Sequence, residues 1–395
     1  MTFVEWIIQY KWVLLAYLIL AIIVYINRKK FIVESKIFLL YKTKHGVGFI
    51  NNFAEKHKEF VKTVGYSAIG IGFLGMLIII GFFIKGLYDL FFVPGAPPTV
   101  SLAIPGVAIP GSPITIPFVY GILALFIVVL FHEFGHGIVA RANGIKIKST
   151  GVGLLGPLPL AFVEPDEKQL VKESSVVQNS IFAAGPFMNI VLFGIFFLLC
   201  TAVFIPLTDT MSHTDGVSFN SISPGLAADK AGMQKDIVYV EFNNVAFNDT
   251  TGFLAALTNT TPGQAVSIKD INGKTSVITL GANPKNESSP YLGVIGVQND
   301  YIPNSGNWLY QAVYYIVFFF AKLTLWVYLL SLGIGLANLL PLGPVDGGRM
   351  LNIALIDING KEKGTKWWAK ISWITLFVLI ILLVIPILRS LLFKA

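Results

Sequence analysis

Residues 116–142 read IPFVYGILALFIVVLFHEFGHGIVARA, an almost unbroken apolar run that contains two histidines and a glutamate. At about 1.5 Å per residue, a helix of this length crosses the roughly 30 Å hydrocarbon core of a membrane. Ionisable side chains inside such a helix are costly, and they usually have partners and a function. The run therefore predicts a membrane-spanning helix that carries chemistry through His132, Glu133 and His136.

The rest of the chain has the composition of a membrane protein. Of its 395 residues, 54% are hydrophobic and only 13% are charged, which is more apolar surface than one soluble core can hide. We expect an all-α transmembrane core of about six helices, a membrane-associated β-hairpin and a small α+β domain. The expected spans are Ile7–Ile26, Val64–Leu90, Ile116–Ala142, Ser180–Pro206, Leu309–Leu340 and Trp367–Leu392.

The basic residues indicate how these spans are oriented. The formal net charge is +7, and Lys and Arg gather in residues 28–62, 141–172 and 349–370. All three segments lie on one side if the spans alternate, and the positive-inside rule makes that side cytoplasmic. We interpret the basic excess as topology, without a nucleic-acid partner. The loop 94–117, the segment 211–307 and both termini are expected outside, in a multi-pass protein of the cytoplasmic membrane of a prokaryote.

The segment 211–307 is predicted to be a soluble domain between two spans. Charged residues, Asn and Thr become frequent there, and residues 216–245 have the pattern of strand, short helix and strand. Asn272-Gly273 predicts the turn of a hairpin between Ala265–Lys269 and Thr275–Leu280. This segment is expected to fold around its own core, because the single Cys200 lies inside an apolar span.

The run SPGLAADKAGM, residues 223–233, resembles part of a bacterial-type PDZ domain. That resemblance implies a domain that binds an extended peptide or a chain end by adding a strand to its sheet. The alternative is a small β-rich spacer without a ligand.

Residues 144–163 cannot form a helix, because glycine and proline recur through them. The run stays apolar, and lipid does not tolerate unpaired backbone, so it should form a hairpin or line a protein cavity. The residues that exclude a helix are Gly151, Gly153, Gly156, Pro157 and Pro159.

The His-Glu-x-x-His motif is typical of zinc hydrolases. Residues i and i+4 share one face of a helix, so His132 and His136 can hold one zinc ion through ring nitrogens. Glu133 follows the first ligand directly and can reach a water on that metal as general base. Chance occurrence is the alternative, and the apolar surroundings of the motif argue against it.

A catalytic zinc site needs a third protein ligand and one open position. Asp346 is the candidate for this ligand. It follows the fifth expected span in the run NLLPLGPVDGGR, residues 338–349, and His132 is expected at a similar depth, nearer the cytoplasmic face. The alternative is that Asp346 only caps a turn before two glycines.

Together the two motifs resemble the site-2 protease family of intramembrane zinc metalloproteases. A Gly-Pro-x-x-Asn run at residues 185–189 and the PDZ-like insert match the same family, and the resemblance covers residues 118–360. One departure is Gly343, which stands where many members of the family have a second proline.

This resemblance implies one Zn²⁺ per chain and a role for each matching residue. Glu133 corresponds to the general base and Asp346 to the third ligand, while Asn189 and Asn338 correspond to polar groups that bind substrate. For the two asparagines, interhelical hydrogen bonding is the alternative.

The expected activity is hydrolysis of peptide bonds within or near the transmembrane segments of membrane-protein substrates. A substrate helix has to unwind first, and the hairpin is expected to hold the unwound segment as an added strand. Two other classes remain open, namely a catalytically inactive scaffold that binds partners through the PDZ-like domain, and an ion transporter. The expected divisions are 1–117 (two spans, a basic loop and the outer loop), 118–210 (the histidine motif and hairpin), 211–307 (the PDZ-like domain) and 308–395 (the third-ligand motif and last span).

Overall fold

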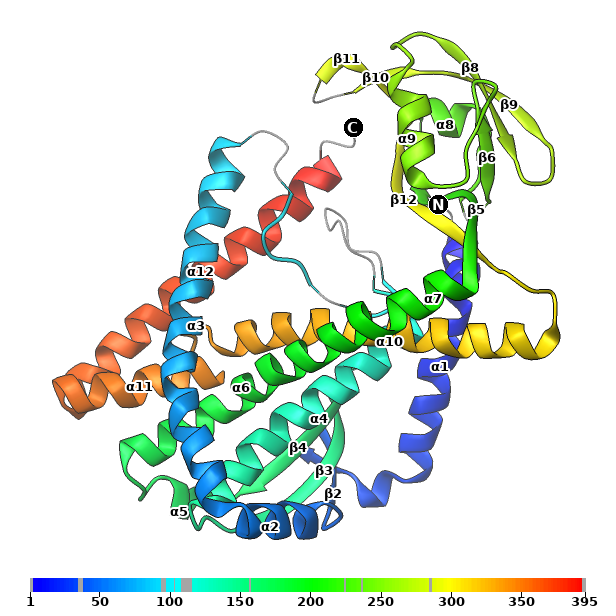
Figure 1. Ribbon diagram of the computed structural model, residues 1–395. Helices are drawn as coiled ribbons and strands as arrows, with labels where there is room; N and C mark the ends of the chain where they lie inside the picture. The colour runs from blue at the N-terminus through cyan, green and yellow to red at the C-terminus, as the bar shows by residue number, and fades with distance from the viewer. Residues whose placement is uncertain are drawn as a thin grey trace. The chain divides into compact units, whose positions relative to one another are not determined.

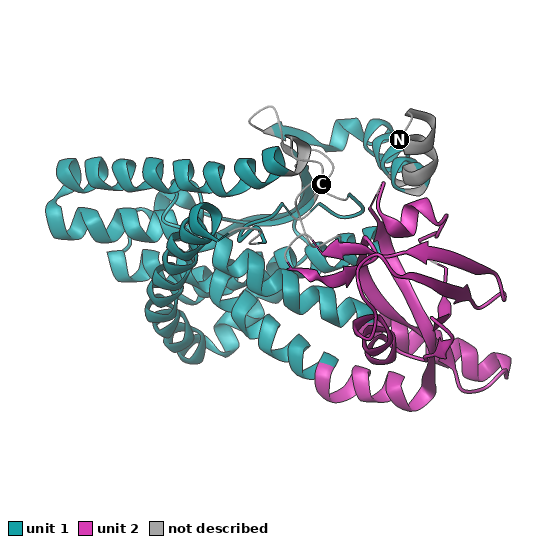
Figure 2. Ribbon diagram, turned by 90° about the horizontal axis from the view of Figure 1, so that it is seen from above, with its two compact units in different colours: residues 1–200, 322–395 teal, residues 201–321 magenta. Residues whose placement is uncertain are grey.

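The structure is a computed structural model that describes residues 3–34, 38–93, 97–102, 104–107, 116–155, 158–223, 225–235, 237–283 and 286–392. The chain forms two compact units, which Figure 2 colours separately. Unit 1 consists of residues 1–200 and 322–395, and unit 2 consists of Thr201–Ala321. Parts of the predicted outer loop (residues 94–96, 103 and 108–115), together with Gly156, Pro157 and Pro224, lie outside the described residues.

Five helices are long and apolar enough to cross a membrane, and they coincide with five of the six predicted spans. The first predicted span falls on α1 (Phe3–Ile26), whose described apolar stretch, Val13–Ile26, is shorter. That span therefore stays a prediction. The five helical segments are α3 (Lys58–Phe92), α4 (Phe118–Ala142), α6 (Ser175–Leu199) continued by the π-helical turn η2 (Cys200–Phe204) and α7 (Ile205–Met211), α10 (Trp308–Asn338) and α12 (Lys361–Leu392).

Glycines allow α4 to pack closely against its neighbours in unit 1 (Figure 1). A Cβ added at Gly135 would lie 2.7 Å from the carbonyl oxygen of Ala184 in α6, and one at Gly137 would lie 2.8 Å from a methyl of Val163. Small residues at helix interfaces let backbones approach, which is how helices associate in lipid. The core around α4 contains Ile50, Ala54, Val61, Ala68, Ile138, Val139, Ala140, Ala142, Ile145, Ile181, Phe182 and Ala183.

The predicted hairpin is one half of a four-stranded antiparallel sheet with the order β1-β2-β3-β4. β3 (Ile147–Leu155) and β4 (Leu158–Pro165) pair as predicted. The prediction was incomplete, because β1 (Ile32–Glu34) and β2 (Phe38–Thr43) extend the sheet from a segment interpreted as a basic loop. The many lysines of that segment concealed the apolar run FLLY of β2. β4 lies at one edge of the sheet, beside α4.

A helical hairpin ends unit 1. α11 (Asp346–Asn359) is followed after one residue by α12, and Gly360 between them has a φ of 76°, which glycine adopts without strain. A Cβ at Gly364 would lie 2.5 Å from the carbonyl oxygen of Leu355, so the two helices meet closely there. The remaining short helices of this unit are η1 (Arg28–Lys30), α2 (Val47–Lys56) and α5 (Glu167–Leu170).

Unit 2 contains an antiparallel sheet in the order β12-β5-β6-β8-β9, with β7 paired to β6. The predicted hairpin around Asn272-Gly273 is confirmed by the pairing of β8 with β9. The predicted short helix is α8, and α9 packs beside the sheet. The elements are β5 (Ser212–Ile222), α8 (Ala227–Lys230), β6 (Tyr239–Phe242), β7 (Val245–Ala246), α9 (Thr250–Thr258), β8 (Ala265–Asp270), β9 (Thr275–Thr279), β10 (Gly281–Asn283), β11 (Asn286–Tyr291) and β12 (Val294–Pro303).

Phe253 of α9 is the centre of the unit 2 core. It is fully buried, and its ring meets the rings of Phe219, Phe242 and Phe247 edge to face at centroid distances of 5.4–5.8 Å. These aromatic contacts hold α9 on the sheet.

Replacing Phe253 by Ala should destabilise unit 2 by about 3–5 kcal/mol, because a large cavity would remain among the three rings. The measurement is pulse proteolysis of the full chain in detergent across a denaturant series, scoring cuts within unit 2. The matched control is Leu254→Ala, because Leu254 is 48% exposed on the same helix. Equal shifts of the two midpoints would contradict this account of the core.

Candidate metal centre

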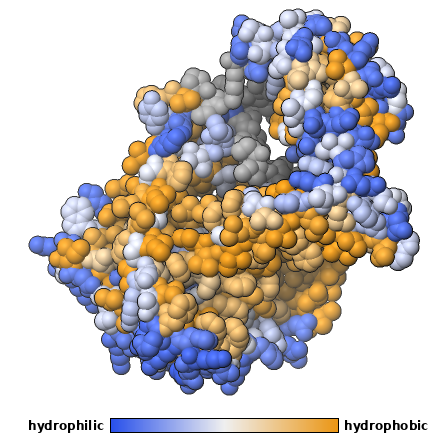
Figure 3. Space-filling model, viewed as in Figure 1, coloured by the Kyte–Doolittle hydropathy of each residue, from blue (hydrophilic) through white to orange (hydrophobic). Residues whose placement is uncertain are grey.

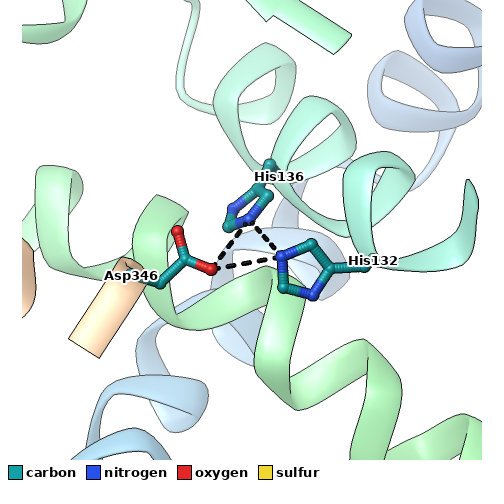
Figure 4. A group of neighbouring side chains, drawn as sticks. All are labelled: His132, His136 and Asp346. Atoms are coloured by element: carbon teal, nitrogen blue, oxygen red, sulfur yellow. Dashed lines mark hydrogen bonds and ion pairs between the residues drawn. The ribbon is translucent and has the colours of Figure 1, made fainter. Parts of the chain in front are cut away.

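Three predicted ligands converge inside unit 1 (Figure 4). His132 and His136 lie one turn apart on α4, and Asp346 is the first residue of α11. The Nε2 atoms of the two histidines are 3.1 Å apart, and Asp346 Oδ2 lies 3.1 Å from His132 Nε2 and 3.3 Å from His136 Nε2. His132 is only 6% exposed. Two helices distant in sequence thus bring three ligand atoms to one point.

The triangle has the size that a zinc ion requires. Donors about 2.0–2.1 Å from a tetrahedral zinc are about 3.3 Å from one another. The three observed separations of 3.1–3.3 Å match this value. Two imidazoles and one carboxylate are also a donor set typical of catalytic zinc, with one position left open.

Hydrogen bonds orient both imidazoles so that Nε2 points to the centre. His136 Nδ1 lies 2.6 Å from the carbonyl oxygen of Ile181, so this nitrogen carries the proton and donates. His132 Nδ1 lies 3.2 Å from Asn189 Nδ2, and the buried Oδ1 of the same amide has no hydrogen-bond partner among the described residues. Turning this amide by 180° directs Oδ1 to His132, where it can accept from Nδ1–H and leave Nε2 free to bind a metal. Such partners fix the tautomer of metal-binding histidines.

Charge favours the ionised form of the third ligand. Burial raises the pKa of the Asp346 carboxyl, but the positive charge of protonated imidazoles beside it outweighs burial and holds that pKa well below its usual range. A Zn²⁺ ion would supply positive charge in place of those protons, so it would favour the anionic carboxylate in the same way.

Glycines at two places give the ligands their room. A Cβ at Gly185 of α6 would overlap the Nε2 atom of His136, so the Gly-Pro run lets the backbone of α6 lie directly against the ligand pair. A Cβ at Gly347 or Gly348 would overlap backbone atoms of Leu339 or Leu342. The two glycines after Asp346 therefore let α11 begin tightly against the preceding loop.

Two further contacts support the centre. Trp368 Nε1 donates to the carbonyl oxygen of Gly348 at 2.8 Å, which ties α12 to the start of α11. The backbone N–H of Val163 in β4 donates to Glu133 Oε2 at 3.2 Å. The Glu133 side chain therefore extends from α4, the helix that carries both histidines, to β4, an edge strand of the sheet.

The two predicted substrate-binding asparagines lie in different surroundings. Asn189 is fully buried against His132, and its backbone carbonyl accepts a hydrogen bond from Ser331 Oγ at 2.8 Å. Asn338 donates to the carbonyl oxygen of Ile334 in its own helix. Contact with a substrate stays a prediction for both residues. The contact of Asn189 with His132 joins α6 to α4, as the alternative of interhelical hydrogen bonding expected, but the sequence did not identify a metal-ligand histidine as the partner.

Comparison with known sequences agrees with this geometry. The sequence model of peptidase family M50 matches residues 120–382, which is more than half of the chain and includes all three ligands and Glu133. The chain belongs to peptidase family M50. Membership of the M50 family, together with five long apolar helices, identifies an integral membrane protein.

Relatives of this member of family M50 occur in archaea and bacteria. An uncharacterized protein of Methanocaldococcus jannaschii is 28% identical over 348 residues, which cover 87% of this chain and 85% of the relative. The zinc metalloprotease RasP of Oceanobacillus iheyensis is 25% identical over 244 residues, which cover 50% of this chain and 56% of RasP. A solved PDZ domain of an SdrC-like protein from Listeria monocytogenes matches 20% of this chain and 85% of its own at 23% identity; its TM-score of 0.18 carries no weight for the fold.

Asn189→Leu should lower the affinity of the M50 centre for zinc about 10–100-fold, because His132 loses the partner that fixes its ring. Asn189→Asp keeps an acceptor oxygen and should remain near the wild-type affinity. The measurement is competition against a chromogenic chelator, with Asn338→Leu as the control whose affinity should not change. A Leu variant that is folded and binds zinc like the wild type would show that Asn189 does not orient His132.

Proposed function

We propose that this protein is a zinc metalloendopeptidase that cleaves membrane-protein substrates within or near their transmembrane segments. The observation that carries the proposal is the triangle of His132, which is buried, with His136 and Asp346, which are partly buried, and with Glu133 next to His132 in the chain. The triangle alone would suit a structural metal. A carboxylate that immediately follows a ligand, and that a structural site does not need, favours hydrolysis.

Each residue then has a distinct task. His132, His136 and Asp346 would hold Zn²⁺, which supplies a Lewis acid that lowers the pKa of water towards neutrality and polarises a carbonyl. Glu133 takes the proton from the attacking water and later delivers it to the leaving amine. Asn189 and Ile181 keep the imidazoles in the orientation that binding needs. Membership of family M50 and the similarity to the zinc metalloprotease RasP support the same assignment.

The free edge of β4 supports a way to present the substrate. Val163 N–H points away from β3, because it donates to Glu133. Outward positions alternate along an antiparallel ladder, so the N–H of Ala161 also points away from β3, to the edge that no strand pairs with. Ala161 is only 5% exposed, so a substrate segment would have to displace side chains that cover this edge. An unwound substrate segment could pair there and satisfy its backbone while it lies beside Glu133.

Unit 2 is proposed to bind an extended peptide or chain end as a PDZ-like domain. β12 is an edge strand of the unit 2 sheet, and α9 packs against it. Strand addition beside a helix is the mode by which PDZ domains bind peptides.

The proposed location is the cytoplasmic membrane of a prokaryote, with the metal centre nearer the cytoplasmic face and unit 2 outside. The distribution of Lys and Arg supports this orientation through the positive-inside rule. The archaeal and bacterial relatives agree with a prokaryotic host.

Glu133→Gln should reduce cleavage of a reconstituted single-span substrate by about 10²–10⁴-fold, because general acid–base catalysis supplies a factor of that size. Zinc content should stay at the wild-type level. Glu167→Gln, at an exposed position of α5, is the control. Equal product from wild type and Glu133→Gln would eliminate the protease and favour the scaffold.

Ala161→Pro should lower kcat/KM about tenfold while zinc stays bound, because it removes one outward donor of the β4 edge without removing a bond to β3. Ala161→Val adds similar bulk and keeps the N–H, so it separates the lost donor from crowding. If the proline variant cleaves as fast as the valine variant, substrate does not pair with β4.

A further inference from the structure

The first turns of α12 carry an exposed surplus of positive charge. Lys361, Lys363, Lys366 and Lys370 are all exposed. The only acidic residue among them is Glu362, whose carboxylate lies 2.7 Å from Lys366 Nζ. The pair is well exposed, with side-chain exposures of 83% and 74%, so it neutralises at most one of the four lysines. Lys363, Lys366 and Lys370 are three or four residues apart and share one face of the helix, whereas Lys361 lies on another face.

Two exposed tryptophans lie among these lysines. Trp367 is 52% exposed and Trp373 is 71% exposed. Lys370 Nζ lies 5.4 Å from the centre of the Trp367 ring, as a cation–π contact. Indoles are costly in water but are enriched where membrane meets water, because one end is apolar and the other donates a hydrogen bond. These first turns of α12 therefore suit a boundary between membrane and water better than open solvent.

The same helix continues as a membrane span, which fixes the kind of interface. The spanning segment runs from Lys361 to Arg389, and the lysines and tryptophans occupy its first end. In Figure 3, hydrophilic residues lie at the margin where Figure 1 places the turn from α11 to α12, and an apolar band begins beside them. A surface at this end of a membrane span is expected at the depth of the lipid headgroups.

We propose that the surface formed by Lys363, Lys366, Trp367, Lys370 and Trp373 binds the headgroups of anionic phospholipids. The lysine stems extend along the apolar surface while their ammonium groups reach the phosphates. The two indoles occupy the boundary between headgroups and acyl chains. A soluble acidic protein fits less well, because it offers no apolar layer for Trp373 at the start of a membrane span.

Lipid at this surface acts on the metal centre through the neighbouring Trp368. Trp368 is partly buried, and its indole donates to the carbonyl oxygen of Gly348, two residues after Asp346. One helical turn thus holds both the headgroup site and the support of the third ligand. A headgroup that stabilises this turn strengthens the hold on Asp346. This second step rests on the proposed metal centre, whereas lipid binding does not.

The first test is native mass spectrometry of the full chain in detergent with an equimolar mixture of phosphatidylglycerol and phosphatidylcholine of matched acyl chains. The wild type should retain phosphatidylglycerol in preference. Lys363→Gln combined with Lys366→Gln and Lys370→Gln should lower that preference about tenfold or more, because each lysine near an anionic surface contributes on the order of a fivefold effect.

The matched control removes the same charge from unit 2 through Lys230→Gln, Lys235→Gln and Lys274→Gln. This variant should keep the wild-type preference. An equal loss of the lipid preference in both triple variants would show that net charge alone determines it. No loss in the α12 variant would show that its lysines are solvated and do not bind headgroups. Either outcome overturns the proposal, and neither depends on peptidase activity.

The second test compares zinc affinity in nanodiscs of phosphatidylcholine with and without phosphatidylglycerol. The wild type should bind zinc about fivefold more tightly or better with the anionic lipid, the lower end of typical coupling between sites. Trp368→Phe should keep the lipid preference. Its zinc affinity should rise less than that of the wild type when the anionic lipid is present. A gain that is identical in Trp368→Phe would come from zinc gathering at the charged membrane, and would refute the route through Trp368.

Discussion

The meeting of one carboxylate with two imidazoles is the contact on which the structure of unit 1 depends. Asp346 Oδ2 lies within 3.3 Å of both histidine Nε2 atoms, and the chain reaches this point from two helices more than 200 residues apart. Glycines make the approach feasible, because side chains at Gly185, Gly347 or Gly348 would occupy the space of ligands or supporting backbone. The geometry of the centre therefore depends on close backbone packing as well as on the three ligand side chains.

The membrane sets the second constraint. Lipid offers no partners to backbone polar groups, so an unwound substrate of the proposed peptidase would need protein groups to satisfy its backbone. The β1–β4 sheet ends in an edge strand whose N–H already reaches Glu133. The β4 edge and Glu133, the proposed general base, thus lie together, which suits the proposed pairing of a substrate segment with this sheet. The same constraint places charge and indoles at the end of α12 rather than along it.

Sequence patterns predicted the elements that are determined by residues close together in the chain. The i, i+4 spacing of His132 and His136 fixes one helix face, and the length of each apolar run fixes a span. Asp346 could be found because catalytic zinc demands a third ligand and few acidic residues follow an apolar span.

The strands β1 and β2 escaped prediction, because pairing with β3 is a long-range contact and lysines obscured their pattern. The orienting contact of Asn189 with His132 depends on how α6 faces α4, which a single sequence does not encode. The substrate-binding roles of Asn189 and Asn338 stay predictions, as does the first span.

X-ray absorption of the purified full chain at the zinc edge shows whether these three side chains share one zinc ion. We expect one zinc per chain, with two imidazole nitrogens and one carboxylate oxygen at about 2.0–2.1 Å and a further oxygen from water. Removal of the carboxylate in Asp346→Ala should change that shell while the histidine scattering remains. A folded protein that takes up no zinc, or a shell unaltered by loss of Asp346, would contradict this expectation.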